Sequence, residues 1–119
     1  MIQGRINNQR EPRLSLEVHG IDGPVDVILD TGFSGALCLS KRHIECLGMT
    51  PKGVEWYELG NGSLVAQPVY LVRIRWFGSE REVEAIMTGA EDSMIGSELM
   101  IGCLVTLDYA SGELAIERR

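Results

Sequence analysis

The stretch that decides the fold is "VDVILDTGFSG", residues 25–35. The apolar residues before Asp30 predict a strand that ends at this carboxylate. Thr31, Gly32 and Ser34 are then typical of a turn, because such residues bond to nearby backbone groups or tolerate unusual backbone angles. Asp30 follows directly on apolar residues, so we expect its carboxylate to lie beside buried surface, where it needs hydrogen-bonding partners.

Alternation of apolar and polar residues continues on both sides of this stretch. In "RLSLEVHG", Leu14, Leu16 and Val18 alternate with polar residues, as in a half-buried strand. Extended segments are also predicted at 25–30, 54–76, 79–87 and 104–117. Within the second of these, Asn61-Gly62 is the pair that a tight hairpin turn prefers. Strands dominate throughout, so the predicted class is all-β and barrel-like.

Two short helices are expected among these strands. In "SKRHIECLG", Ile44 and Leu47 lie three positions apart on one helical face. Ser40 is placed to cap this helix at its start, and Gly48 is suited to end it in a left-handed conformation. A second short helix is expected between the two glycines of "GSELMIG", residues 96–102.

Composition limits the domain count and the partners. The chain has 119 residues, of which 45% are hydrophobic, and residues 1–119 are expected to form one domain. A formal net charge of −6 disfavours attraction to nucleic acid phosphates or anionic lipid. Charged residues or glycine interrupt every apolar run before it reaches the length of a membrane helix. We therefore expect a soluble protein with no nucleic acid or membrane partner.

Cysteine and histidine residues give no metal or nucleophile pattern. The three cysteines, Cys38, Cys46 and Cys103, form no CxxC pair, and no secretory signal is recognised, so we expect free, mostly packed thiols and a cytoplasmic location. His19 and His43 are far apart and have no zinc-type spacing with cysteine, which favours surface or structural roles. Cys38 lies in the apolar run "ALCLS", so a packed thiol is favoured over a nucleophile. No cofactor or metal is predicted.

Three segments together resemble a known family. "VILDTGFSG", residues 27–35, resembles the signature of the retropepsin-like aspartic proteases, in which an apolar strand leads into Asp-Thr/Ser-Gly. Near the end of the domain, that family has two apolar residues and a glycine packed behind the catalytic turn and followed by a short helix. Met94-Ile95-Gly96 matches this element, and "WYELGNGSLVAQPVY", residues 56–70, matches the family's flap hairpin. The order of these elements covers most of the chain.

The resemblance implies a closed acid-protease barrel with a flap hairpin and one or two short helices. It also implies an aspartic endopeptidase acting on peptide or protein substrates. Two neighbouring carboxylates share one proton, so one can activate water while the other polarises the peptide carbonyl. The chain has one Asp-Thr-Gly, at Asp30, and the segments 21–23, 87–89 and 110–112 each lack part of the motif. The family mechanism therefore requires a homodimer in which Asp30 faces its equivalent across a two-fold axis.

The resemblance also assigns individual roles. The catalytic residues it implies are Asp30, Thr31 and Gly32, and those for substrate binding are Ser34, Gly60, Asn61, Gly62 and Ile95. Thr31 is expected to be buried and to tie the two turns of the dimer together, and Ser34 to hydrogen-bond the outer oxygen of Asp30. Trp56 and Tyr57, on one arm of the flap, either contact the substrate or pack beneath the flap.

Some residues depart from the family pattern, and other functions stay open. Phe33 stands where the viral enzymes often have alanine, and the flap tip is less rich in glycine than theirs. The hairpin at 105–117 extends past the second helix, as in cellular and bacterial single-domain members. A non-catalytic module that binds a peptide or protein by strand addition is the main alternative. A purely structural β domain leaves the combined turn, flap and Gly96 pattern unexplained.

Overall fold

Strands make up most of the molecule. The structure is a computed structural model that describes residues 1–58 and 60–119. Within these ranges the strands are β1 (Ile2–Ile6), β2 (Pro12–Leu16), β3 (Val25–Leu29), β4 (Leu37–Ser40), β5 (Gly53–Glu58), β6 (Leu64–Trp76), β7 (Ser79–Thr88), β8 (Ser93–Ile95), β9 (Cys103–Asp108) and β10 (Glu113–Arg118). The helices are α1 (Lys41–Leu47) and α2 (Ser97–Met100). The predicted all-β class with one or two short helices is confirmed.

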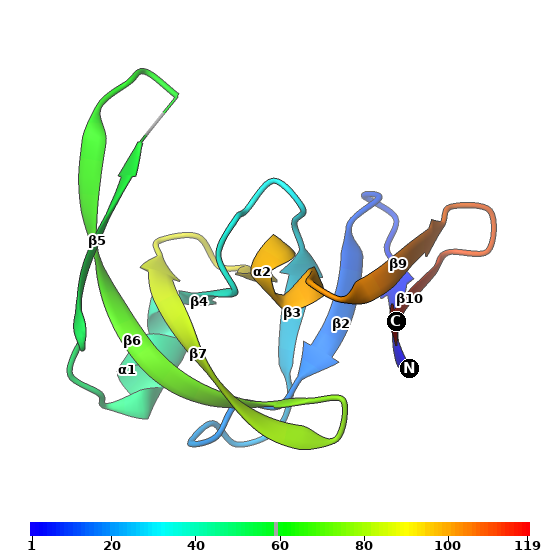
Figure 1. Ribbon diagram of the computed structural model, residues 1–119, viewed down its shortest axis with the longest axis horizontal. Helices are drawn as coiled ribbons and strands as arrows, with labels where there is room; N and C mark the ends of the chain where they lie inside the picture. The colour runs from blue at the N-terminus through cyan, green and yellow to red at the C-terminus, as the bar shows by residue number, and fades with distance from the viewer. Residues whose placement is uncertain (59) are drawn as a thin grey trace.

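One curled sheet contains all of these strands, in the order β5-β6-β7-β4-β8-β3-β2-β1-β10-β9 (Figure 1). Just after β2, an isolated antiparallel bridge joins Val18 to Ile74 of β6. The His19 amide donates to the Arg73 carbonyl at 2.9 Å, and the Arg75 amide donates to the Glu17 carbonyl at 3.0 Å. These bonds join the segment that directly follows β2 to β6 and close the middle strands into a barrel.

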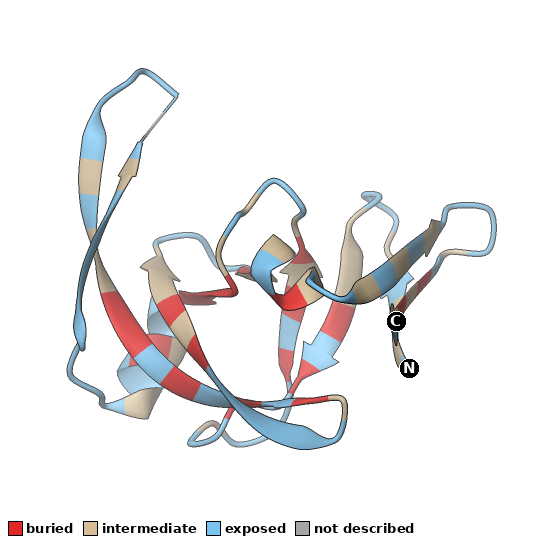
Figure 2. Cartoon of the chain, in the orientation of Figure 1, coloured by how far each residue is buried: buried red, intermediate tan, exposed pale blue. Residues whose placement is uncertain are grey.

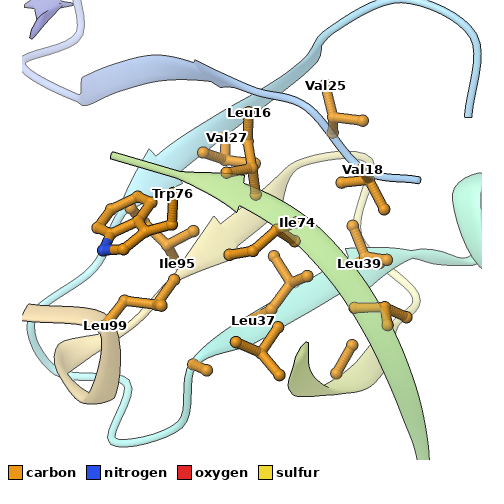
Figure 3. Close-up of a cluster of buried hydrophobic side chains, with 14 of the residues drawn as sticks. Leu16, Val18, Val25, Val27, Leu37, Leu39, Ile74, Trp76, Ile95 and Leu99 are labelled. Atoms are coloured by element: carbon orange, nitrogen blue, oxygen red, sulfur yellow. The ribbon is translucent and has the colours of Figure 1, made fainter. Parts of the chain in front are cut away.

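The core fills this barrel with the side chains that the alternation predicts to be buried. Leu14, Leu16 and Val18 are all buried, and so are every second residue of β3 and the inner residues of β6. Figure 2 shows these buried positions as bands along the strands, and Figure 3 shows side chains from β2, β3, β4, β6, β8 and α2 in one cluster. Because the strand that carries Asp30 is anchored on this core, its end has a fixed position.

Helix α1 begins and ends where the sequence predicts, but without the predicted capping hydrogen bond. Gly48 ends the helix with φ 61°, in the predicted left-handed conformation. Ser40 occupies the capping position, but its hydroxyl makes no capping hydrogen bond, so that prediction is wrong. Instead, Ser40 Oγ lies 2.9 Å from Nδ1 of His43, and the Ser40 amide donates to Ser93 Oγ at 3.0 Å. Ser40 therefore contacts α1 through its hydroxyl and β8 through its backbone amide.

The hairpin between β5 and β6 is wider at its tip than the tight turn predicted for Asn61-Gly62. Glu58 pairs with Leu64, so the connection between the two arms is longer than two residues. Gly62 has the positive φ that a turn requires, at 85°, whereas Asn61 does not. The Asn61 side-chain oxygen instead accepts hydrogen bonds from the Ser63 amide and hydroxyl, at 3.0 and 2.6 Å. This local bonding organises the tip without a two-residue turn.

The structure also tests the expectations for the cysteine thiols and for membrane-spanning helices. All three cysteines are free, as predicted. Cys38 is buried and Cys103 is partly buried, but Cys46 is exposed, so it is not a packed thiol. Among the described residues, no helix has the length and apolar character needed to cross a membrane.

Candidate active site

Asp30 is held at the point where two strands from distant parts of the chain run side by side. β8 pairs in parallel with β3, so that Leu29 lies opposite Ile95, and in the antiparallel sense with β4. The amide of Asp30 continues the β3–β8 ladder by donating to the carbonyl of Ile95 at 3.0 Å. β8 is therefore wedged between the strands on either side of the Asp30 turn and sets their spacing.

Local hydrogen bonds shape the turn itself. The Gly32 amide donates to Oδ1 of Asp30 at 2.9 Å, and the Phe33 amide donates to the Asp30 carbonyl at 3.1 Å. A Cβ on Gly32 would lie 3.2 Å from Oδ1 of Asp30, which is closer than most such contacts. The carboxylate is partly buried and Thr31 is exposed in the single chain. Among the described residues, Ser34 makes no hydrogen bond to Asp30.

Gly96 packs directly behind this turn. Its amide donates to the Ala36 carbonyl at 3.0 Å, and the next amide, of Ser97, donates to the Phe33 carbonyl at 2.8 Å. A Cβ on Gly96 would lie 2.4 Å from the Phe33 carbonyl oxygen and 2.2 Å from that of Gly35. Only glycine fits this approach. The predicted packing of residues 94–96 behind the Asp30 turn, leading into a short helix, is confirmed.

The assignment of Ile95 to substrate binding needs correction. Its side chain is fully buried in the core, with an exposed fraction of 0%. A side chain with no accessible surface makes no contact with a bound peptide. Ile95 instead positions Asp30, because its carbonyl accepts the Asp30 amide and its side chain anchors β8 to the core.

The flap residues lie apart from the Asp30 turn. Gly60, Asn61 and Gly62 are exposed at the tip of the β5–β6 hairpin, which extends away from the loop between β3 and β4 (Figure 1). Trp56 is 67% exposed, so it does not pack beneath the flap. Tyr57 has the opposite orientation, since successive strand residues point to opposite faces, and it lines a pocket beside the Asp30 turn.

That pocket has a volume of about 180 Å³. Its walls come from the loop after Asp30, from both arms of the flap, from β7 and from α2. The lining residues are Phe33, Ser34, Gly35, Ala36, Leu37, Glu55, Tyr57, Val69, Glu84, Ile86 and Glu98. The three glutamates were not found by sequence reasoning, because each lies on a different element and no local motif connects them.

Charges around the pocket affect its ionisable groups. Lys52 forms an ion pair with Glu84, and this hydrogen bond lowers the pKa of the Glu84 carboxyl and raises that of Lys52. Burial, followed by the charge of Glu55, raises the pKa of Tyr57. The Tyr57 hydroxyl donates to Oε2 of Glu55 at 3.2 Å. Tyr57 therefore stays neutral and fixes the position of one of the three carboxylates.

The surroundings of Cys38 and His43 indicate structural rather than catalytic roles. Burial raises the pKa of the Cys38 thiol to about 11, so the thiol is protonated near neutral pH and is a packed residue rather than a nucleophile. Burial, and then the charge of Arg42, lowers the pKa of His43, whose ring contacts Ser40 and Ser93. His19 is exposed. Within the described part of the chain, no three His, Cys, Asp or Glu side chains converge in a way that would hold a metal ion.

Comparisons with known proteins place this geometry among solved structures. No protein-family model matches the sequence, and no curated protein matches it either. A retropepsin-like aspartic protease from Rickettsia conorii is similar in structure, with a TM-score of 0.73 and 15% identity over 98% of this chain and 89% of that one. The simian foamy virus protease has a TM-score of 0.58 and 17% identity, over 75% of this chain and 91% of that protein.

A third similar structure is the EIAV protease in complex with the inhibitor HBY-793. Its TM-score is 0.56 and its identity is 21%, over 80% of this chain and 89% of that one. The similarity extends over nearly the full length of the bacterial protein, including the hairpin that follows α2. The protein therefore has the fold of the retropepsin-like aspartic proteases.

Proposed function

We propose that this protein is an aspartic endopeptidase that works as a homodimer. The observation that carries the proposal is the position of Asp30, at the end of a core-anchored strand in a retropepsin-like fold, with Gly96 packed behind its turn. Such a carboxylate is fixed in place and still partly exposed. A reacting group that is held in position needs no reorganisation when the substrate arrives.

The proposed mechanism uses a pair of Asp30 carboxylates that share one proton. The ionised member takes a proton from a water molecule as that water attacks the peptide carbonyl carbon. The protonated member donates a hydrogen bond to the carbonyl oxygen as charge develops on it, and a proton is then transferred to the leaving amine. The Gly32 amide, which donates to Oδ1 of Asp30, helps to hold this carboxylate in position.

Each chain provides one such carboxylate, so two chains must meet with their Asp30 turns face to face. Thr31, exposed in the single chain, is then the residue expected to become buried between the two turns. Gly60, Asn61 and Gly62 are proposed to cover the bound peptide, and Ser34 to hydrogen-bond the outer Asp30 oxygen once the dimer forms. Peptides or proteins are the proposed substrates. A cytoplasmic location, without nucleic acid or membrane partners, stays a prediction.

Cleavage of a diverse peptide library at several pH values tests this function. We expect wild-type protein to cleave some members and Asp30→Asn to cleave none, because asparagine cannot accept a proton from water. Asp22→Asn is a matched control in an exposed turn. Circular dichroism confirms that each variant is folded. Cleavage by folded Asp30→Asn at the wild-type rate would contradict the proposal.

The alternative is a module that binds peptides without cleaving them. It is favoured by β5, which lies at one end of the sheet and pairs only with β6 among the described strands, so its other edge is free for an added strand. Binding of library peptides by wild-type and Asp30→Asn protein alike, with no cleavage by either, would support this alternative.

A further inference from the structure

The pocket beside the Asp30 turn has features that select one kind of substrate side chain. We call it the acidic side pocket and define it by the loop Phe33–Leu37, the three glutamates Glu55, Glu84 and Glu98, and Tyr57. We propose that it binds a lysine or arginine side chain of the peptide, so that the enzyme prefers a basic residue near the bond that it cleaves. This proposal rests on the proposed protease function.

The size of the pocket suits one side chain. Its volume of about 180 Å³ is below the roughly 300–1,000 Å³ of pockets that hold whole small molecules. The partly buried Phe33 and Ile86 supply apolar lining, and the buried Ala36, Leu37 and Val69 close the pocket behind them. An aliphatic chain that enters the pocket therefore loses contact with water and gains contact with apolar atoms.

The rim of the pocket carries negative charge from three separate elements. Glu55 lies on β5, Glu84 on β7 and Glu98 on α2. Lys52 pairs with Glu84 and offsets one of the three charges. In the described part of the chain, Glu55 and Glu98 form no salt bridge, so an excess of negative charge remains at the mouth.

An apolar floor beneath an acidic rim matches the structure of a basic side chain. Lysine and arginine have an apolar stem that can be buried and a charged head that stays at a polar boundary. Since no three His, Cys, Asp or Glu groups in the described residues converge to hold a metal ion, the carboxylates are too spread out for a metal site. Acidic substrate side chains are repelled by the same rim, so its charge determines specificity.

The position of the pocket connects it to the reaction. Its wall begins at Phe33, whose amide donates to the carbonyl of Asp30, and continues along the chain to Leu37. The opposite wall is the inner face of the flap arm, at Glu55 and Tyr57. A peptide held between the Asp30 turn and the flap therefore passes the mouth of this pocket.

Peptide pairs test the preference directly. A peptide that the enzyme cleaves is resynthesised with lysine or glutamine at each position around the cleaved bond. At one position we expect kcat/KM to be about tenfold higher for lysine, because two unpaired carboxylates face the side chain. This ratio should shrink in high salt, since mobile ions screen charges at an open site.

Variants of the rim identify the pocket. Glu55→Gln with Glu98→Gln should bring the lysine-to-glutamine ratio close to one, chiefly by lowering kcat/KM for the lysine peptide. Glu98→Lys should also remove the lysine preference, because the added positive charge offsets Glu55. Glu113→Gln, an exposed position on β10, is the matched control and should keep the wild-type ratio. A tenfold ratio that survives the double variant would overturn the assignment to this pocket.

Failure of this proposal is distinguishable from failure of the protease function. Cleavage with no lysine preference at any position overturns the pocket proposal and leaves the protease standing. If no peptide is cleaved, the protease proposal fails, and fluorescence anisotropy of labelled peptide pairs with the Asp30→Asn protein then decides the pocket. A preference for lysine peptides that the double variant removes supports the pocket, and equal binding of both peptides overturns it.

Discussion

Gly96 and Gly35 approach so closely that a Cβ on Gly96 would lie 2.2 Å from the Gly35 carbonyl oxygen. Both residues belong to the contact between the loop after Asp30 and the start of α2. Backbone atoms cannot move aside as the end of a flexible side chain can. The contact therefore makes the Asp30 turn dependent on one glycine far from it in the sequence.

We predict that Gly96→Ala destabilises the fold by about 3 kcal/mol and abolishes peptide cleavage, because the added methyl group forces β8 and the Asp30 turn apart. Urea unfolding measures the first effect and a peptide assay the second. Gly53→Ala is the control, since a Cβ there meets nothing within 4 Å. A Gly96→Ala protein as stable as Gly53→Ala would contradict the packing described here.

Mixing wild-type and Asp30→Asn chains tests whether two carboxylates are needed. If chains exchange freely and the mixed dimer is inactive, an equal amount of Asp30→Asn should reduce the activity of a fixed amount of wild-type protein to about half, because half of the wild-type chains then lie in mixed dimers. Sedimentation measures the assembly of the same samples. Activity that is unaffected by the added chains, in samples that sediment as exchanging dimers, would show that one Asp30 is sufficient.

The cysteines should differ in reactivity according to their burial. Cys38 is buried with its pKa raised to about 11, whereas Cys46 is exposed on α1. At pH 8 we expect iodoacetamide to modify Cys46 first and to leave Cys38 intact while the protein is folded. Peptide mapping by mass spectrometry locates the label. In urea, Cys38 should react as well, and early labelling of Cys38 without urea would contradict its burial.

His43 should make the fold less stable as the pH falls. Burial lowers its pKa in the folded state, so the unfolded chain binds a proton more readily than the folded chain does. The contribution of His43 to the free energy of unfolding is complete at pH values above its pKa in the unfolded chain, which is about 6.5. This contribution is lost as the pH falls through that value toward the lower pKa of the folded state. The charged ring would also lie close to Arg42, whose positive charge repels it.

Urea unfolding at pH 5 and pH 8 measures this loss. His43→Asn, which does not titrate, should show a smaller change between the two pH values than wild type. His19→Asn changes a histidine at an exposed position and is the control. An equal pH dependence in wild type and His43→Asn would assign the effect to other groups.

Sequence reasoning found the parts of the fold whose signal is local. The alternation in β2, β3 and β6 predicts their buried faces correctly, and the Asp30 turn and Gly96 were recognised from short motifs. β1 was missed because Gly4, in the middle of that strand, contributes no hydrophobic signal. The structure requires glycine there, since a Cβ would lie 2.2 Å from the Arg13 carbonyl oxygen of β2. Long-range packing of this kind has no sequence pattern of its own.

The residues of the candidate site also fall into those with a local sequence signal and those without one. Asp30 and its turn were predictable because neighbouring residues build them. The acidic side pocket was not, because two strands and a helix must come together before its glutamates share one rim. Ile95 was misassigned because a motif gives the residue type but does not show which way its side chain points.

The parallel pairing of β3 with β8 also has a consequence for how the protein is made. Leu29 and Ile95 are partners, and the strand that completes the Asp30 turn lies in the last quarter of the chain. A chain emerges from the ribosome N-terminus first, so Asp30 is translated well before β8 and Gly96. The turn at Asp30 therefore has neither its partner strand nor the packing of Gly96 until residues 93–96 have been made, and the proposed active site does not assemble before then.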